Sequence, residues 1–214
     1  MMHSALPHLA ESPSKHVFPV PTRCKNIEAL VEAQGNPGGT VLCSVHLPLV
    51  KLLLRHMVDS GIPPTAVVAD RSLIHDGRIG VWGSEQSLPG LIADKNVLFR
   101  TRHVLKTGGL IATLVDVDLG NPVNCNLFRF IRSTGARMVF FTTALQPDGA
   151  VMVEFFAPPD PFCLSDESVL ANLQSLQNRV IEILQLPSSP PVITLMPMDK
   201  RVPRAQVAYL ELDS

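Results

Sequence analysis

A histidine stands where a strongly apolar stretch of the chain gives way to a helical pattern. Residues 39–45 are rich in apolar and β-branched side chains, His46 follows them, and residues 47–61 repeat apolar side chains at helical spacing. This order predicts a buried strand that ends at His46 and leads into a helix. In open α/β sheets, ligands bind at the carboxyl ends of the strands, where loops and helix amino termini converge. His46 is therefore our first candidate for a catalytic base.

Two carboxylates follow a second apolar run. Residues 110–115 predict another buried strand, and Asp116 and Asp118 come soon after it. Because the carboxyl ends of parallel strands meet at one edge of a sheet, either carboxylate is a candidate to orient the imidazole of His46.

A third predicted strand, residues 65–69, ends close to Arg71. A guanidinium group binds phosphate oxygens through two parallel hydrogen bonds, so Arg71 is a candidate phosphate anchor. The ordinary alternative is a surface arginine that pairs with Asp70 or Asp94.

The succession of predicted elements indicates an α/β fold with a mixed, mainly parallel central sheet and flanking helices. Apolar runs at residues 136–143 and 150–156, separated by the turn residues 146–149, predict an antiparallel hairpin. Helices are predicted at residues 27–34, 94–107 and 165–184. A glycine-rich loop is predicted at residues 72–89, where it either overhangs the site or only covers the protein surface.

The prolines, 19 in total, concentrate near the two ends of the chain. They divide it into an extended arm (residues 1–23), one α/β domain (residues 24–186) and a tail (residues 187–214) that adds an edge strand at residues 206–212.

Composition narrows the classes of function. The net charge is −1 with no run of like charges, which argues against nucleic-acid binding, and no apolar run reaches the roughly 20 residues of a membrane-spanning helix. Four scattered cysteines without a C-x-x-C pair favour a reducing, cytoplasmic location and predict no metal site. Nucleotide-binding and serine-hydrolase fingerprints are absent from the sequence, and no cofactor is predicted.

From residue 39 to residue 184 the order of these pieces resembles the glycerolipid and lipid A acyltransferase superfamily, most closely its late lipid A (lauroyl/myristoyl-type) branch. Ser44-Val45-His46 matches the histidine at the start of a helix, and Arg71 matches the arginine after the second strand. Residues 105–118 match a helix that ends in glycine before a strand closing in aspartate. Residues 128–130 (Phe-Arg-Phe) match a phenylalanine-bearing loop, and residues 134–136 (Thr-Gly-Ala) lead into the next strand.

The resemblance implies a glycerol-3-phosphate acyltransferase-like fold and acyl transfer from an acyl-CoA or acyl-carrier-protein thioester to a hydroxyl or amine. It also implies a role for His46 as base. Asp116 or Asp118 is the candidate to supply the orienting acid, and Arg71 and Lys51 are candidates for substrate binding. Family members are typically anchored by an amino-terminal hydrophobic segment, and its absence here favours a soluble acceptor.

The family motif, H-x-x-x-x-D/E, has Lys51 in the place of its carboxylate. A lysine cannot accept the imidazole N–H, and its charge disfavours the imidazolium that forms during reaction. Two alternatives to an acyltransferase therefore stay open. The first is a non-catalytic descendant that binds an acyl chain, a carrier protein or another protein partner, and the second is an α/β domain of unknown activity outside this superfamily. Under these alternatives His46 satisfies a buried strand end, and Lys51 is an ordinary solvated helix residue.

Overall fold

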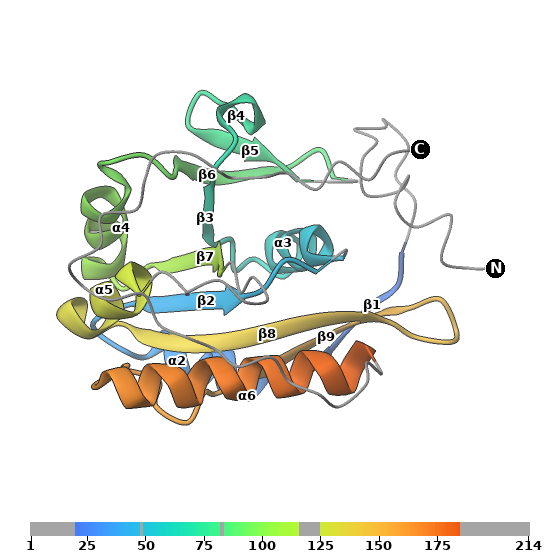
Figure 1. Cartoon of the computed structure of the whole chain (residues 1–214). Helices are drawn as coiled ribbons and strands as arrows, with labels where there is room; N and C mark the ends of the chain where they lie inside the picture. Colours follow the sequence, from blue (N-terminus) through green and yellow to red (C-terminus); the bar gives the residue numbers. More distant parts are fainter. Residues whose placement is uncertain (1–19, 48, 82–83, 116–124, 185–214) are drawn as a thin grey trace, which may run out of the picture.

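A mixed β-sheet runs through the computed structural model, which describes residues 20–47, 49–81, 84–115 and 125–184 (Figure 1). The strands of the sheet are β1 (Thr22–Lys25), β2 (Thr40–Ser44), β3 (Thr65–Val68), β4 (Ile74–His75), β5 (Arg78–Gly80), β6 (Ser87–Ile92), β7 (Leu110–Leu114), β8 (Arg137–Leu145) and β9 (Val151–Phe156). The helices are α2 (Ile27–Gln34), α3 (Val50–Asp59), α4 (Val97–Lys106), α5 (Asn126–Thr134), α6 (Asp166–Leu184) and the short 3-10 helix η1 (Arg71–Leu73).

The spatial order of the strands is β1-β9-β8-β2-β7-β3-β6-β5-β4. Strands β8, β2, β7, β3 and β6 run parallel to one another, while β9 returns antiparallel to β8 and β5 pairs antiparallel with β4 and β6. The prediction of an α/β fold with a mixed, mainly parallel sheet is confirmed. Strand β2, which leads to His46, lies between β7 and β8 and is buried along its whole length.

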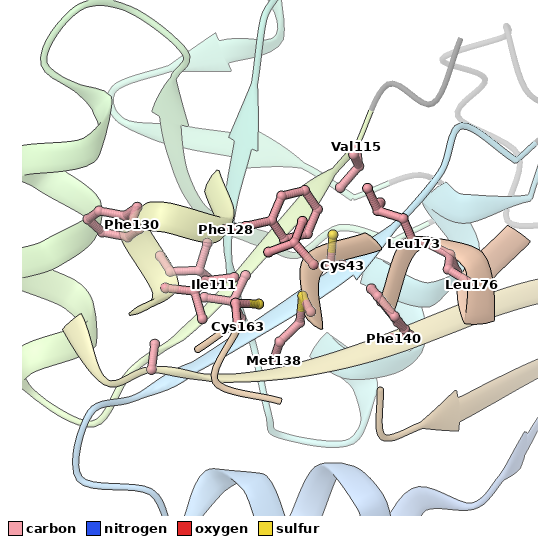
Figure 2. Packing of buried hydrophobic residues seen from close by; sticks show 14 of the residues in the cluster. Cys43, Ile111, Val115, Phe128, Phe130, Met138, Phe140, Cys163, Leu173 and Leu176 are labelled. Carbon is pink, nitrogen blue, oxygen red and sulfur yellow. The ribbon is translucent and has the colours of Figure 1, made fainter. Parts of the chain in front are cut away.

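Helices cover both faces of the sheet (Figure 1). One face packs apolar side chains of β2 and β8 against α4, α5 and α6, and the other packs them against α2 and α3. Strand alternation explains this division, because Val41 and Cys43 face one core whereas Leu42 faces the other. In the first core, Phe128 and Phe140 are fully buried near Cys43 and Leu173 (Figure 2).

The amino ends of the central strands are closely packed. The Asn36 side chain donates hydrogen bonds to the carbonyl oxygens of Gly39 and Gly135, both at 2.9 Å. A Cβ atom on Gly38 would lie 2.3 Å from the Gly135 oxygen, and one on Gly39, whose φ is +76°, would lie 2.7 Å from the Leu105 oxygen. Glycine at these positions lets β2 start directly against its neighbours.

Several predicted elements have the expected type and approximate bounds. The helix after His46, the helices at α2, α4 and α6, and the β8–β9 hairpin all form. Strands β2 and β3 are parallel, but they are not adjacent, because β7 lies between them. The predicted edge strand at residues 206–212 lies outside the described residues.

Three predictions differ from the structure. Thr22 and Arg23 were predicted to be part of the extended arm. They belong to β1, which forms because it pairs with β9. Residues 128–130, predicted as a loop, lie in α5, whose apolar residues Phe128, Phe130 and Ile131 are buried. The predicted loop at residues 72–89 contains η1, β4, β5 and the start of β6, short elements that depend on cross-strand pairing.

None of the helices within the described ranges is long and apolar enough to cross a lipid bilayer.

Candidate functional site

The carboxyl ends of four neighbouring parallel strands, β2, β7, β3 and β6, form one edge of the sheet. The register pairs Ser44 of β2 with Leu114 of β7, and Val68 of β3 with Ile92 of β6. Along the chain, His46 comes soon after β2 and residue 116 soon after β7. Asp70 follows β3, and Asp94 follows β6. The fold therefore gathers at one edge the strand ends that precede most of the predicted site residues.

His46 is exposed at this edge, two residues beyond the end of β2. Its neighbours on both sides are anchored, since Ser44 is fully buried and Leu47 is 8% exposed. Helix α3 starts four residues after His46, at Val50, and packs its apolar side against the sheet. His46 thus lies between the end of a buried strand and the start of a helix, and its side chain is exposed to solvent.

Ser44 adds a buried hydroxyl below His46. Its Oγ has no hydrogen-bond partner among the residues that the structure describes, whereas its carbonyl oxygen accepts the N–H of Val115 at 2.7 Å. Ser44 lies two residues after Leu42 on an extended strand, so its side chain is on the face of the sheet that α3 covers. Sequence reasoning did not select Ser44 as a site residue.

Asp116 and Asp118, the predicted orienting acids, lie outside the described residues. The described chain reaches Val115, which is buried and bonded to Ser44. The backbone therefore brings the strand that precedes Asp116 alongside the strand that precedes His46, as the candidate pairing requires.

Lys51 is exposed in the first turn of α3. That turn has no acidic residue, and the residue before the helix makes no side-chain capping bond. A positive side chain is unfavourable at the positively polarised end of a helix, where carboxylates or phosphates are favoured. The first turn of α3 thus has the charge of an anion-binding surface.

Arg71 begins η1, directly after the carboxyl end of β3, and is exposed. Asp70 binds the Ser72 amide through its Oδ1 at 2.8 Å, and Asp94 forms a 2.7 Å ion pair with Arg100. No ion pair of Arg71 is found among the described residues, but its charge acts on Asp94, so the alternative in which Arg71 pairs with that carboxylate stays open.

The positive charges of Arg100 and Arg71 influence the carboxyl group of Asp94. Its pKa is below the ordinary value, first because the Asn96 amide donates to it, and further because of the charges of Arg100 and Arg71. Arg71 thus lies within electrostatic range of Asp94 while its guanidinium faces solvent at the same edge as His46.

The described residues contain no cluster of three or more histidine, cysteine or carboxylate side chains that would hold a metal ion. The four cysteines, all described, are thiols rather than disulfide partners. Burial raises the pKa of the Cys43 and Cys163 thiols, which keeps them protonated and unreactive. Cys43 faces the core, as predicted. His56 is half-buried on α3, and its Nε2 lies 3.4 Å from the Ser60 hydroxyl, so it is a helix-packing residue.

A second polar cluster lies away from this edge, around Glu154 of β9. Its side chain is only 8% exposed and contacts Lys25 at 2.9 Å and Arg179 through Nε at 2.8 Å and also through Nη2. Burial raises the pKa of this carboxyl, but the hydrogen bonds and charges of Arg179 and Lys25 outweigh it and leave the pKa lowered. The one signal in the sequence was a charged residue inside an otherwise apolar strand.

Comparison with known proteins leaves the chain without an assigned family. No protein-family model matches the sequence, and no curated protein matches it significantly.

Proposed function

We propose that this protein is an acyltransferase of the lipid A acyltransferase-like type, with a glycerol-3-phosphate acyltransferase-like fold. It moves an acyl group from an acyl-CoA or acyl-carrier-protein thioester to a hydroxyl or amine acceptor. The observation that carries the proposal is the exposed His46 at the carboxyl end of the buried central strand β2, beside the end of β7. That is the position from which a histidine base reaches a ligand bound at the sheet edge.

In the proposed reaction, the neutral imidazole of His46 removes the proton from the acceptor hydroxyl or amine as its oxygen or nitrogen attacks the thioester carbonyl carbon. A tetrahedral intermediate forms, and its collapse breaks the carbon–sulfur bond. His46 then returns the proton to the departing thiolate, so that the products are an ester or amide and a free thiol. The histidine ends in its starting state.

Asp116 or Asp118 takes the part of the orienting acid in this proposal. The hydrogen bond between Val115 and Ser44 supports that assignment, because it joins the strands that lead to Asp116 and to His46. A carboxylate bonded to the second ring nitrogen fixes the tautomer and stabilises the imidazolium. Arg71 and Lys51 are the proposed contacts for phosphate groups of the donor, since both are exposed cations near the same sheet edge.

The experiment measures thiol release from a long-chain acyl-CoA in the presence of a panel of hydroxyl and amine acceptors. We expect acceptor-dependent release that falls at least about 100-fold in His46→Ala, because general-base catalysis contributes factors of that size. His75→Ala is the matched control, since His75 is also exposed but lies on the β4–β5 hairpin. Survival of release in His46→Ala would remove His46 from the mechanism, and an equal loss in His75→Ala would show that the effect is not specific to His46.

A second candidate function is favoured by Lys51 and by the lack of any acid in the first turn of α3. In this alternative the protein binds an acyl thioester without cleaving it. Acyl-CoA would then raise the melting temperature, because a ligand that binds only the folded state stabilises it, yet no acceptor would yield free thiol. Lys51→Ala would weaken that binding, which distinguishes specific recognition from non-specific association of the acyl chain.

A further inference from the structure

The outward face of α4 carries cations and apolar side chains next to one another. Phe99, Arg102 and Lys106 are spaced by three and four residues, so they lie along one side of the helix. Leu98 flanks them, and Lys95 lies in the turn just before the helix. All five side chains are exposed, Phe99 by 79% and Leu98 by 41%. We call this set the α4 stripe.

The charged side chains of the α4 stripe are all positive. Residues 95–107 include no aspartate or glutamate, and the acid just before them, Asp94, is already paired with Arg100. No ion pair joins Lys95, Arg102 or Lys106 to a carboxylate within the described residues. Because the whole chain has a net charge of −1, the stripe is a local concentration of positive charge on a nearly neutral protein.

The opposite side of α4 fixes the stripe in place. Thr101 and Leu105 are buried against the fold, and Arg100 donates to the carbonyl oxygen of Ile92 at 2.9 Å. A large aromatic side chain that remains 79% exposed on an element anchored in this way is not needed by the core. A surface that combines exposed aromatic and basic side chains indicates a contact with an anionic, partly apolar partner.

We propose that the α4 stripe docks on the surface of an anionic lipid bilayer, with Phe99 and Leu98 entering the interface and the three cations meeting lipid phosphates. This inference does not depend on the catalytic role of His46. It adds a membrane-surface contact to a chain whose described helices include none that spans a bilayer.

Size favours a lipid surface over a folded protein partner. The stripe is about 16 Å long and about 10 Å wide, which is roughly a fifth of the ~800 Å² that a stable protein interface buries on each side. A bilayer requires no matching shape, since each cation near an anionic leaflet contributes independently and an aromatic ring inserts at the headgroup level.

The test is sedimentation of the full chain with vesicles of phosphatidylcholine alone or mixed with phosphatidylglycerol. We expect partition onto the mixed vesicles only, and its loss at about 0.5 M salt, where charge interactions are screened within a few ångströms. Arg102→Gln combined with Lys106→Gln should lower the partition coefficient roughly 25-fold, about fivefold for each cation. Phe99→Ser should lower it while leaving the salt dependence in place.

Two control variants match these changes. Arg23→Gln combined with Arg78→Gln removes the same charge elsewhere, and Leu164→Ser removes another apolar side chain, one that is 70% exposed. Neither should alter partition. Equal binding to both kinds of vesicle, or an equal loss in the control variants, would overturn the proposal. So would stripe-dependent binding to polyglutamate without any binding to vesicles, which would assign the stripe to an acidic protein instead.

Discussion

The two ends of the central parallel strands are built differently. At the amino ends, Gly38 and Gly39 lie against the backbone of Gly135 and Leu105, with no room for a single added methyl group. At the carboxyl ends, titratable side chains such as His46 and Arg71 are exposed. One end of the sheet is closed by backbone packing, and the other presents polar groups to solvent.

The charged groups of the protein show the same contrast. Glu154 is buried and is bonded by Lys25, Asn26 and Arg179, which use both of its oxygens. At the carboxyl edge, Arg71 is exposed, and Asp94, on which its charge acts, is paired with Arg100. A buried charge must be paired in the folded protein to offset its loss of hydration, whereas an exposed charge stays hydrated and remains accessible to a ligand. We therefore expect the residues around Glu154 to contribute to stability and the exposed residues at the carboxyl edge to contribute to binding.

The largest expected effect is at the closed end of the strands. Gly38→Ala would place a methyl group 2.3 Å from a backbone oxygen that is itself hydrogen-bonded, so the free energy of unfolding should fall by about 3 kcal/mol. Gly80→Ala is the control, because a Cβ there meets nothing within 4 Å. Urea denaturation of both variants measures the difference, and equal stability would show that the amino ends are not closely packed.

The next effect is at Glu154. Glu154→Gln removes the charge that Lys25 and Arg179 share, and we expect it to cost about 2 kcal/mol, less than a fully buried pair because both cations are partly exposed. Since the folded-state pKa of Glu154 is lowered, its contribution is present above the ordinary value of 4.5 and is lost as the pH falls below it. Stability measured against pH should therefore decline less steeply in Glu154→Gln than in the wild type. Parallel curves would contradict this assignment.

The smallest effects on stability are expected at the open end. His46→Ala and Lys51→Ala should each change the free energy of unfolding by less than about 1 kcal/mol, because both side chains are exposed. Thermal melting of the two variants is the measurement. A large loss in either would mean that the carboxyl edge is part of the structural framework, and the comparison between the two ends would no longer hold.

Local pattern in the sequence was sufficient for the elements that lead to the site. The apolar run before His46 forms β2, and the helical periodicity after it forms α3, because each element buries a continuous apolar face. The turn at residues 146–149 likewise predicted the β8–β9 hairpin. These features depend on residues close together in the chain, so they are visible without a structure.

Elements that depend on distant partners were missed. Strand β6 contains Pro89 and Gly90, which disfavour strand, and it forms between β3 and β5. Strand β1 is four residues long and exists through its pairing with β9. Asn26 directly precedes α2, but its φ is 57° and its side-chain amide donates to Glu154 instead of capping the helix. The partners of β1 and Asn26 lie more than 100 residues away in the chain, so these contacts cannot be read from a local pattern.

The central claim is that His46 acts as a base together with Asp116 or Asp118, and double-mutant cycles with each carboxylate test it most directly. Acyl-CoA thiol release is measured for the wild type, His46→Ala, Asp116→Asn, Asp118→Asn and the two double variants, with melting temperatures to confirm folding. Residues that work as one unit have non-additive effects, so we predict that the double variant with the orienting acid is no slower than His46→Ala alone. Losses that multiply in both double variants, or a rate changed by neither Asp116→Asn nor Asp118→Asn, would contradict the account.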